Sequence, residues 1–168
     1  MSLFQDLNTR TDAEAFSALQ RCCGASRWVQ LMLDARPFSS DAAVFEAAED
    51  CWAKMAHSDI LEAFSHHPKI GANIETLRAK FQQTAGWSAS EQASVSQASD
   101  AVLEALAQGN IDYEAKFGYI FIVCATGKSA AEMLSLLQAR LVNAPADEIK
   151  LAAAEQAKIT RIRLEKLS

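Results

Sequence analysis

Helix-breaking residues are rare in this chain, and this constrains its fold more than any other feature. The 168 residues include six glycines and three prolines, and apolar residues recur with the period of one face of an α-helix. The stretch from Tyr119 to Cys124 is β-branched and aromatic, which favours a strand, but one short strand would have no partner. We therefore expect an all-α protein in which that stretch is a buried helix or an extended segment.

Capping residues and prolines set the expected helix ends. Ser, Thr or Asp begins most of the segments, Pro68 ends one of them, and Pro145 stands at the favoured first position of the last. A long helix from Ser88 is expected to fray at Gln108–Asn110. These signals predict a single compact domain over residues 1–168 with about eight helices, at residues 11–23, 26–35, 39–55, 58–66, 74–84, 88–108, 129–142 and 145–167, with a further turn or two over 111–118.

Charge and hydropathy exclude several classes of protein. The formal net charge is −5, whereas a nucleic-acid binder normally shows a basic face. No apolar run approaches the roughly 20 residues of a membrane span, and no secretory pattern stands at the N-terminus. Together these features predict a cytoplasmic protein. The four cysteines form no C-x-x-C pair, so buried thiols in a reducing compartment are expected, with a cysteine nucleophile or metal site as the alternative.

An acidic residue at the start of the long helix has two interpretations. Ser88 and Glu91 have the S-x-x-E spacing of a capping box, so Glu91 could serve only the backbone N–H of Ser88. Glu91 also stands four residues before Val95, on the face expected to point inward. A carboxylate at the edge of a core needs a partner or a ligand.

The last helix places an arginine on its apolar side. At 100° per residue, the inward face comprises Ile149, Ala152, Ala153, Gln156, Ile159, Arg163 and Leu167. Arg161 points the other way. Because arginine stays charged when buried, Arg163 needs either an internal carboxylate or an anionic ligand, and guanidinium geometry suits a carboxylate.

Two adjacent histidines precede a proline in HHPKIG, His66 to Gly71. Most histidines at helix ends are caps or surface residues, but Pro68 fixes the backbone beside this pair. A rigid corner holds an imidazole in one orientation, as a general acid or base requires. No H-x-x-x-H pattern is present, so we expect no metal site.

Several of these motifs together resemble a known family. HHPKIG, SASEQ, FGYIFIVCATGKS and KITRIRLEKL, with RPFSS at Arg36 to Ser40, occur in order and at matching spacing. The chain is similar over nearly its whole length to 2-oxo-4-hydroxy-4-carboxy-5-ureidoimidazoline (OHCU) decarboxylases of urate degradation. The resemblance implies an all-α homodimer that needs no cofactor and converts its small-molecule substrate to (S)-allantoin and carbon dioxide.

The resemblance also implies roles for individual residues. His67 matches the catalytic histidine, Glu91 its partner, and Arg163 the arginine that binds substrate. His66 is given no role. Ligand-contacting positions are Pro68 of the corner, the segment Ser88, Ala89, Ser90, Glu91 and Gln92, and the stretch Phe121, Ile122, Val123, Cys124 and Ala125, which is expected to act largely through its backbone.

The implied reaction is consistent without a cofactor, because a C=N bond beside the carboxylated carbon makes the substrate its own electron sink. Two alternatives stay open from the residues alone. One is a lyase for another small carboxylated ureide or imidazoline. The other is a non-catalytic helical binding module whose inward polar residues are structural.

Overall fold

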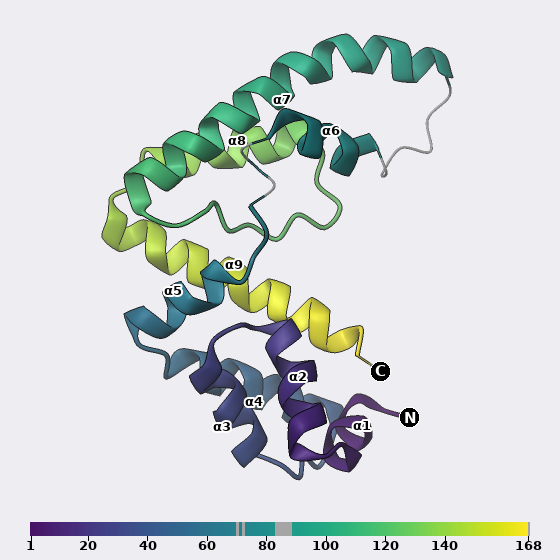
Figure 1. Cartoon of the computed structure of the whole chain (residues 1–168), viewed down its shortest axis with the longest axis vertical. Helices are drawn as coiled ribbons and strands as arrows, with labels where there is room; N and C mark the ends of the chain where they lie inside the picture. Colours follow the sequence, from purple (N-terminus) through teal and green to yellow (C-terminus); the bar gives the residue numbers. More distant parts are fainter. Residues whose placement is uncertain (70, 72, 83–88, 168) are drawn as a thin grey trace. The chain divides into compact units, whose positions relative to one another are not determined.

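The computed structural model describes residues 1–69, 71, 73–82 and 89–167, and within them the side chains of 80–82 and 89–99 are left aside. Every regular element over these ranges is an α-helix (Figure 1), which confirms the all-α prediction. None of these helices combines the length and the low polarity that crossing a membrane would require.

Contacts divide the chain into two compact units. The first comprises residues 1–67, 122–124 and 151 to the C-terminus, and the second comprises 68–121 and 125–150. The helix α9 (Pro145–Glu165) contributes its first residues to the second unit and the remainder to the first. That the whole chain acts as one domain stays a prediction.

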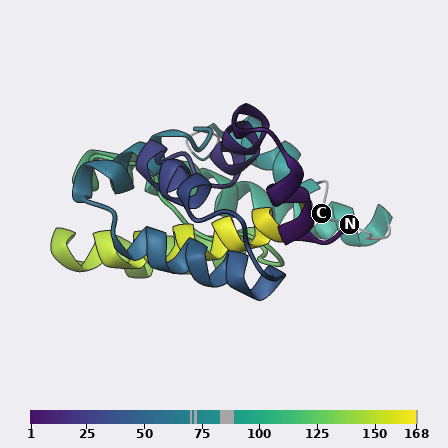
Figure 2. The ribbon, with the colours of Figure 1, turned by 90° about the horizontal axis from the view of Figure 1, so that it is seen from below.

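Five helices and the second part of α9 build the first unit: α1 (Leu3–Thr9), α2 (Asp12–Cys22), α3 (Ser26–Asp34), α4 (Asp41–Ala53) and α5 (His57–Ser65). The caps operate as the sequence predicts, since Thr11 accepts from the Glu14 N–H and Ser40 from the Ala43 N–H. The Trp28 ring is fully buried, and its Nε1 donates to the Ala48 carbonyl at 3.1 Å. Figure 2 shows α4 alongside the second part of α9, where Trp52 Nε1 donates to the Ala153 carbonyl at 3.0 Å.

The RPFSS motif holds α1 in the first unit. Arg36 Nη1 donates to the carbonyls of Leu7 and Arg10, at 2.9 and 3.0 Å, at the end of α1. Asn8 and Phe38 exchange two hydrogen bonds of 2.8 Å, one in each direction. These bonds satisfy carbonyls that a helix end leaves unpaired. The motif therefore has a structural use in this chain.

The second unit contains α6 (Ile74–Gln82), α7 (Ala89–Phe117), α8 (Ala130–Leu141) and the start of α9. The helices α7 and α8 pack along each other (Figure 1). Ser129 caps α8 by accepting from the Glu132 N–H, as its position predicts.

Two helix predictions were wrong. The helix from residue 89 does not fray at Gln108–Asn110 but continues to Phe117 as one helix of 29 residues. Gly109 is a packing residue, because a Cβ there would lie 2.6 Å from Leu137 Cδ2 of α8. The short helix α1 was not predicted.

Residues 119–125 form an extended segment without a strand partner in the described part of the chain, which is one of the two expected outcomes.

The buried row of α9 also differs from the prediction. Its most buried residues follow a spacing of four: Glu148, Ala152, Gln156, Thr160 and Leu164. Ile149, Ala153 and Ile159 are only partly buried. The predicted face was assigned from apolar residues, whereas three members of the buried row are polar, so the prediction placed the inward face too far round the helix. Each of the three has a hydrogen-bond partner inside its unit.

Candidate active site

The corner at His66–Pro68 begins within the last turn of α5. The N–H of His66 donates to the Ala63 carbonyl at 3.3 Å, and the N–H of His67 donates to the Phe64 carbonyl at 3.2 Å. Pro68 then lacks the N–H that would continue the helix. The sequence therefore ends the helix immediately after it has positioned both histidines.

A glycine on another loop fixes the His66 ring. A Cβ on Gly24 would lie 2.4 Å from His66 Cγ, closer than any side chain tolerates. Only glycine at position 24 lets the imidazole of His66 rest on the loop between α2 and α3. His66, which received no role from the sequence, therefore helps to hold the residue that follows it.

The His67 ring contacts the buried row of α9. Its Nε2 lies 2.5 Å from the side-chain oxygen of Gln156, and Gln156 Nε2 donates to Thr160 Oγ1 at 3.1 Å. Gln156 is fully buried and Thr160 is 6% exposed. A chain of neutral polar groups thus runs from the half-buried histidine into the core of the first unit.

The environment of His67 favours the neutral imidazole. Burial lowers the pKa of His67 below its ordinary value of 6.5, the hydrogen bond that the ring donates to Gln156 opposes this, and the charges of Arg163 and His66 lower the pKa further. At neutral pH the ring is therefore uncharged, as a general base must be.

Arg163 lies in the first unit, as His67 does, and its side chain is partly exposed to solvent. Its Nη1 donates to the Arg21 carbonyl at 3.3 Å. The helical-wheel preference for Arg163 over Arg161 agrees with the burial, since Arg161 is exposed and pairs with Glu165 at 3.3 Å. Within the described part of the chain, no carboxylate lies within ion-pair distance of Arg163. The choice between an internal carboxylate and an anionic ligand as the partner of Arg163 stays a prediction.

The predicted ligand-contacting stretch is divided between the units. Phe121 belongs to the second unit, where its ring contacts the Tyr113 ring at 5.2 Å and the Arg140 guanidinium at 4.7 Å. Ile122, Val123 and Cys124 belong to the first, and the N–H of Cys124 donates to Glu155 Oε1 at 3.2 Å. A carboxylate of the chain itself therefore occupies one of the backbone donors that were expected to serve a ligand.

The remaining predicted site residues lie in or beside the second unit. Pro68 is exposed, and Ala125 is partly buried at the end of the extended segment. Ser88 lies outside the described residues. Ala89, Ser90, Glu91 and Gln92 form the first turn of α7, and their side chains are not described. The roles of all these residues, and the choice between cap and site for Glu91, stay predictions.

The structure adds two residues that the sequence did not single out. Gln156 stood on the predicted inward face but carried no charge to draw attention, and Thr160 was placed outside that face. The available signal was their spacing, because an amide and a hydroxyl at i and i+4 on a buried row must satisfy each other or a third group.

The cysteines are buried and unpaired with one another. Burial raises the pKa of the Cys22 and Cys23 thiols to about 11. Over the described residues, no three His, Cys, Asp or Glu side chains are placed to share a metal ion.

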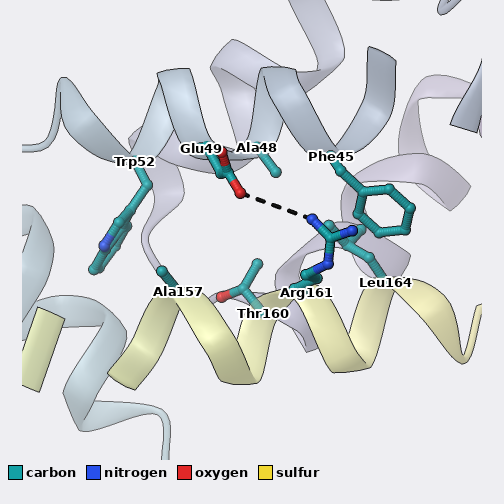
Figure 3. A pocket seen from close by; sticks show the side chains of 8 residues that line it. All are labelled: Phe45, Ala48, Glu49, Trp52, Ala157, Thr160, Arg161 and Leu164. Atoms are coloured by element: carbon teal, nitrogen blue, oxygen red, sulfur yellow. Dashed lines mark ion pairs between the residues drawn. The ribbon is translucent and has the colours of Figure 1, made fainter. Parts of the chain in front are cut away.

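A shallow pocket between α4 and α9 involves none of the predicted residues (Figure 3). Arg161 crosses it toward Glu49, at 3.8 Å, and covers the Phe45 ring at 4.4 Å. Thr160 and Trp52 line it too. The side chain that could hold an anion here is already paired within the pocket, so we regard this pocket as packing between helices.

Comparison with known proteins identifies the family. The family model for OHCU decarboxylase matches residues 8–165, which is nearly the entire chain. The chain belongs to the OHCU decarboxylase family. A solved structure of an OHCU decarboxylase in the presence of (S)-allantoin is 38% identical, with a TM-score of 0.70 over 94% of this chain and 98% of that one.

Other members extend the comparison. The uric acid degradation bifunctional protein TTL of Arabidopsis thaliana is 40% identical over 87% of this chain and 45% of its own length. A solved (S)-allantoin synthase shares the fold, with a TM-score of 0.72 over 99% of this chain and 54% of that one at 20% identity. This chain spans from about a third to under half of the curated relatives it matches.

Proposed function

We propose that this OHCU decarboxylase family member decarboxylates 2-oxo-4-hydroxy-4-carboxy-5-ureidoimidazoline to (S)-allantoin and carbon dioxide in urate degradation. The observation that carries the proposal is the environment of His67. A half-buried imidazole with a lowered pKa is hydrogen-bonded to Gln156 and feels the charge of Arg163, within a chain that matches the family over residues 8–165.

The reaction needs orientation, charge stabilisation and one directed proton. The bond between the ring carbon and its carboxylate breaks, carbon dioxide leaves, and the electron pair moves into the adjacent C=N bond, whose nitrogen takes up a proton. The hydroxyl on the same carbon loses its proton and becomes a carbonyl, and the neighbouring carbon gains a proton. Two protons are taken up and one is released, so one proton is consumed overall. A cofactor is needed where the substrate lacks such an electron sink, and this substrate contains its own.

His67 and Arg163 divide these tasks in the proposal. His67 accepts the hydroxyl proton or delivers a proton to the neighbouring carbon, and delivery from one side yields one enantiomer. Arg163 holds the anionic substrate, because a guanidinium matches a carboxylate with two parallel hydrogen bonds. Glu91, Ser88 and the stretch 121–125 complete the proposed site. Because Glu155 occupies the Cys124 N–H, a ligand would bind that donor only by displacing the carboxylate.

A coupled assay tests the proposal. The ureidoimidazoline is generated from urate by the upstream enzymes, and circular dichroism follows the allantoin formed with and without this protein. Handedness is the critical readout, because the substrate also decays unaided. We expect rapid formation of the (S)-enantiomer. Replacing His67 with Ala should slow it by about 10²–10⁴-fold, the usual contribution of acid–base catalysis.

Matched controls make the result specific. His57→Ala removes an exposed histidine from the first turn of α5 and should leave rate and handedness unchanged. Arg163→Ala should weaken substrate binding, whereas Arg161→Ala should not. Racemic product at the background rate with the unmodified protein would refute the proposal, and another small carboxylated ureide would then be tested as the substrate.

The proposal includes assembly as a homodimer and a cytoplasmic location, both drawn from the expectations above. Sedimentation equilibrium tests the first, and fractionation of the source cells tests the second.

A further inference from the structure

We infer that Gln156 is a positioning residue that holds the hydrogen of the neutral His67 ring on Nε2 and so makes Nδ1 the nitrogen that exchanges the proton. This inference deepens the proposed function and rests on it for the identity of the reaction. It starts from the 2.5 Å contact between His67 Nε2 and Gln156 Oε1.

An amide oxygen has only lone pairs to offer. The ring nitrogen that faces it at this distance must therefore be the one that carries hydrogen. In a neutral imidazole the other nitrogen then has the free lone pair. The contact thus fixes the tautomer, provided that the oxygen of the Gln156 amide faces His67.

The contact behind Gln156 sets the orientation of its amide. Gln156 Nε2 donates to Thr160 Oγ1 at 3.1 Å. The amide nitrogen therefore faces Thr160 and the amide oxygen faces His67, at 2.5 Å from the ring Nε2.

Burial makes the arrangement rigid. Gln156 is fully buried and its α-helix fixes the backbone, so its amide has no water with which to exchange. Among the residues whose side chains are described, the charged or titratable groups that act on the ring are Arg163 and His66. Both are cationic when charged and oppose protonation of the ring. Gln156 is the described group that orients the ring without supplying a charge.

Nuclear magnetic resonance on the ligand-free protein tests the tautomer directly. Two-bond ¹H–¹⁵N spectra of ¹⁵N-histidine-labelled protein distinguish a protonated ring nitrogen from an unprotonated one. We expect hydrogen on Nε2 of His67 above its pKa. Hydrogen on Nδ1 would overturn the inference. Because this measurement uses no substrate, its outcome is independent of whether the protein is a decarboxylase.

Two substitutions at Gln156 separate positioning from packing. Gln156→Leu keeps the volume but removes the acceptor, and it should mix the tautomers and lower kcat about tenfold or more, within the range of acid–base catalysis, with KM unchanged. Gln156→Glu keeps an acceptor but adds a charge. It should restore most of the rate at high pH while moving the acid limb of the profile upward.

Two further variants complete the experiment. Thr160→Val removes the acceptor for the Gln156 amide and should also mix the tautomers, even if the Gln156 variants fail to fold. Gln30→Leu replaces an exposed glutamine that donates to Asp34 in the same unit and should leave tautomer and kcat unchanged. If Gln156→Leu and Thr160→Val both retain the wild-type tautomer and pH profile, Gln156 is only a packing residue.

Discussion

The buried row of α9 carries a polar cluster in each unit, and the two clusters differ in kind. In the second unit, Glu148 is fully buried and accepts from Tyr113, Arg140 and Asn143 at 2.6–3.2 Å. In the first unit, Gln156 and Thr160 link His67 to the core without any formal charge. One cluster is an ion pair whose carboxylate is saturated, and the other is a neutral chain that ends at a titratable ring.

The difference between the two clusters distinguishes buried polar groups that only stabilise the fold from a buried group that can take part in a reaction. Tyr113 donates its hydroxyl hydrogen to Glu148, and burial raises its pKa far above the usual range. The Tyr113 hydroxyl is therefore neutral near neutral pH. The pKa of the His67 imidazole depends on a balance of three effects: burial, one hydrogen bond and the neighbouring charges. Buried polar residues therefore mark function only where one of them still has a proton to exchange.

The strongest challenge to this comparison is the removal of Glu148. Glu148→Ala leaves the Arg140 guanidinium buried without its counter-ion, so the free energy of unfolding should fall by about 3–5 kcal/mol. Denaturant titration measures the loss. Because the double variant Arg140→Met, Glu148→Leu removes both charges, it should recover much of it. A loss below about 1 kcal/mol for the single variant would mean that the ion pair is not a structural element.

Substitution of Gly24 tests how His66 supports the first cluster. A Cβ at this position would lie 2.4 Å from His66 Cγ, so Gly24→Ala must displace the ring or the loop, at about 1–3 kcal/mol of stability. The proposed decarboxylase rate should fall along with it. The variant His66→Gly, Gly24→Ala removes both the Cγ and the Cβ of residue 66, which would lie 2.4 and 2.6 Å from the new Cβ, and should regain stability. If Gly24→Ala is as stable and active as the wild type, the corner does not depend on this contact.

The pH dependence should reflect His67 and leave the second cluster unaffected. Because the pKa of His67 is lowered by folding, the unfolded chain takes up a proton before the folded one as the pH falls. The associated stability is complete above pH 6.5 and is lost as the pH falls through the folded pKa. Activity should lose its neutral base over the lower part of that interval. Thermal unfolding at several pH values, for the wild type and His67→Ala, checks the stability prediction, because the variant should lack this contribution to the change of stability with pH. The pH–rate profile of the wild type checks the activity prediction.

The smallest effect is expected at the exposed ion pair of the α4–α9 pocket. Glu49 is 71% exposed and lies 3.8 Å from Arg161. Such pairs contribute at most about 1 kcal/mol, so Glu49→Ala should shift the denaturation midpoint only slightly. A large loss would show that the pocket is more than a packing contact and would require a new account of it.

The sequence predicted the parts of the fold that local chemistry determines. Thr11, Ser40 and Ser129 mark helix starts because their side chains cap the first turn, and the structure confirms each. The glycine at position 109 led to a wrong prediction of a helix end. It is present because it packs against Leu137, a residue 28 positions away. The buried face of α9 was misplaced for a similar reason: hydropathy does not reveal that Glu148 accepts from Tyr113, 35 positions away, or that Thr160 accepts from the buried Gln156.

The candidate site divides in the same way. His67 could be proposed from the sequence because Pro68 fixes the adjacent backbone, and Arg163 because helical geometry turns it away from the polar side of α9; their roles stay predictions. Gln156 was not predictable as a partner, because it lies 89 positions after His67 and the intervening sequence carries no local signal of the contact. Its role emerges only once the tertiary structure places an amide oxygen against a ring nitrogen.

The burial of Cys22 and Cys23 has a consequence for how the protein tolerates oxidants. Peroxides and disulfides react with thiolates, and a thiol with a pKa of about 11 is ionised in only on the order of one molecule in ten thousand at pH 7. Two adjacent buried cysteines in the same unit as the proposed base, of which Cys22 donates its thiol hydrogen to the Ala18 carbonyl, therefore carry little risk of sulfenic acid formation. Under oxidative stress, this part of the molecule should retain its chemistry after exposed thiols elsewhere in the cell have been modified.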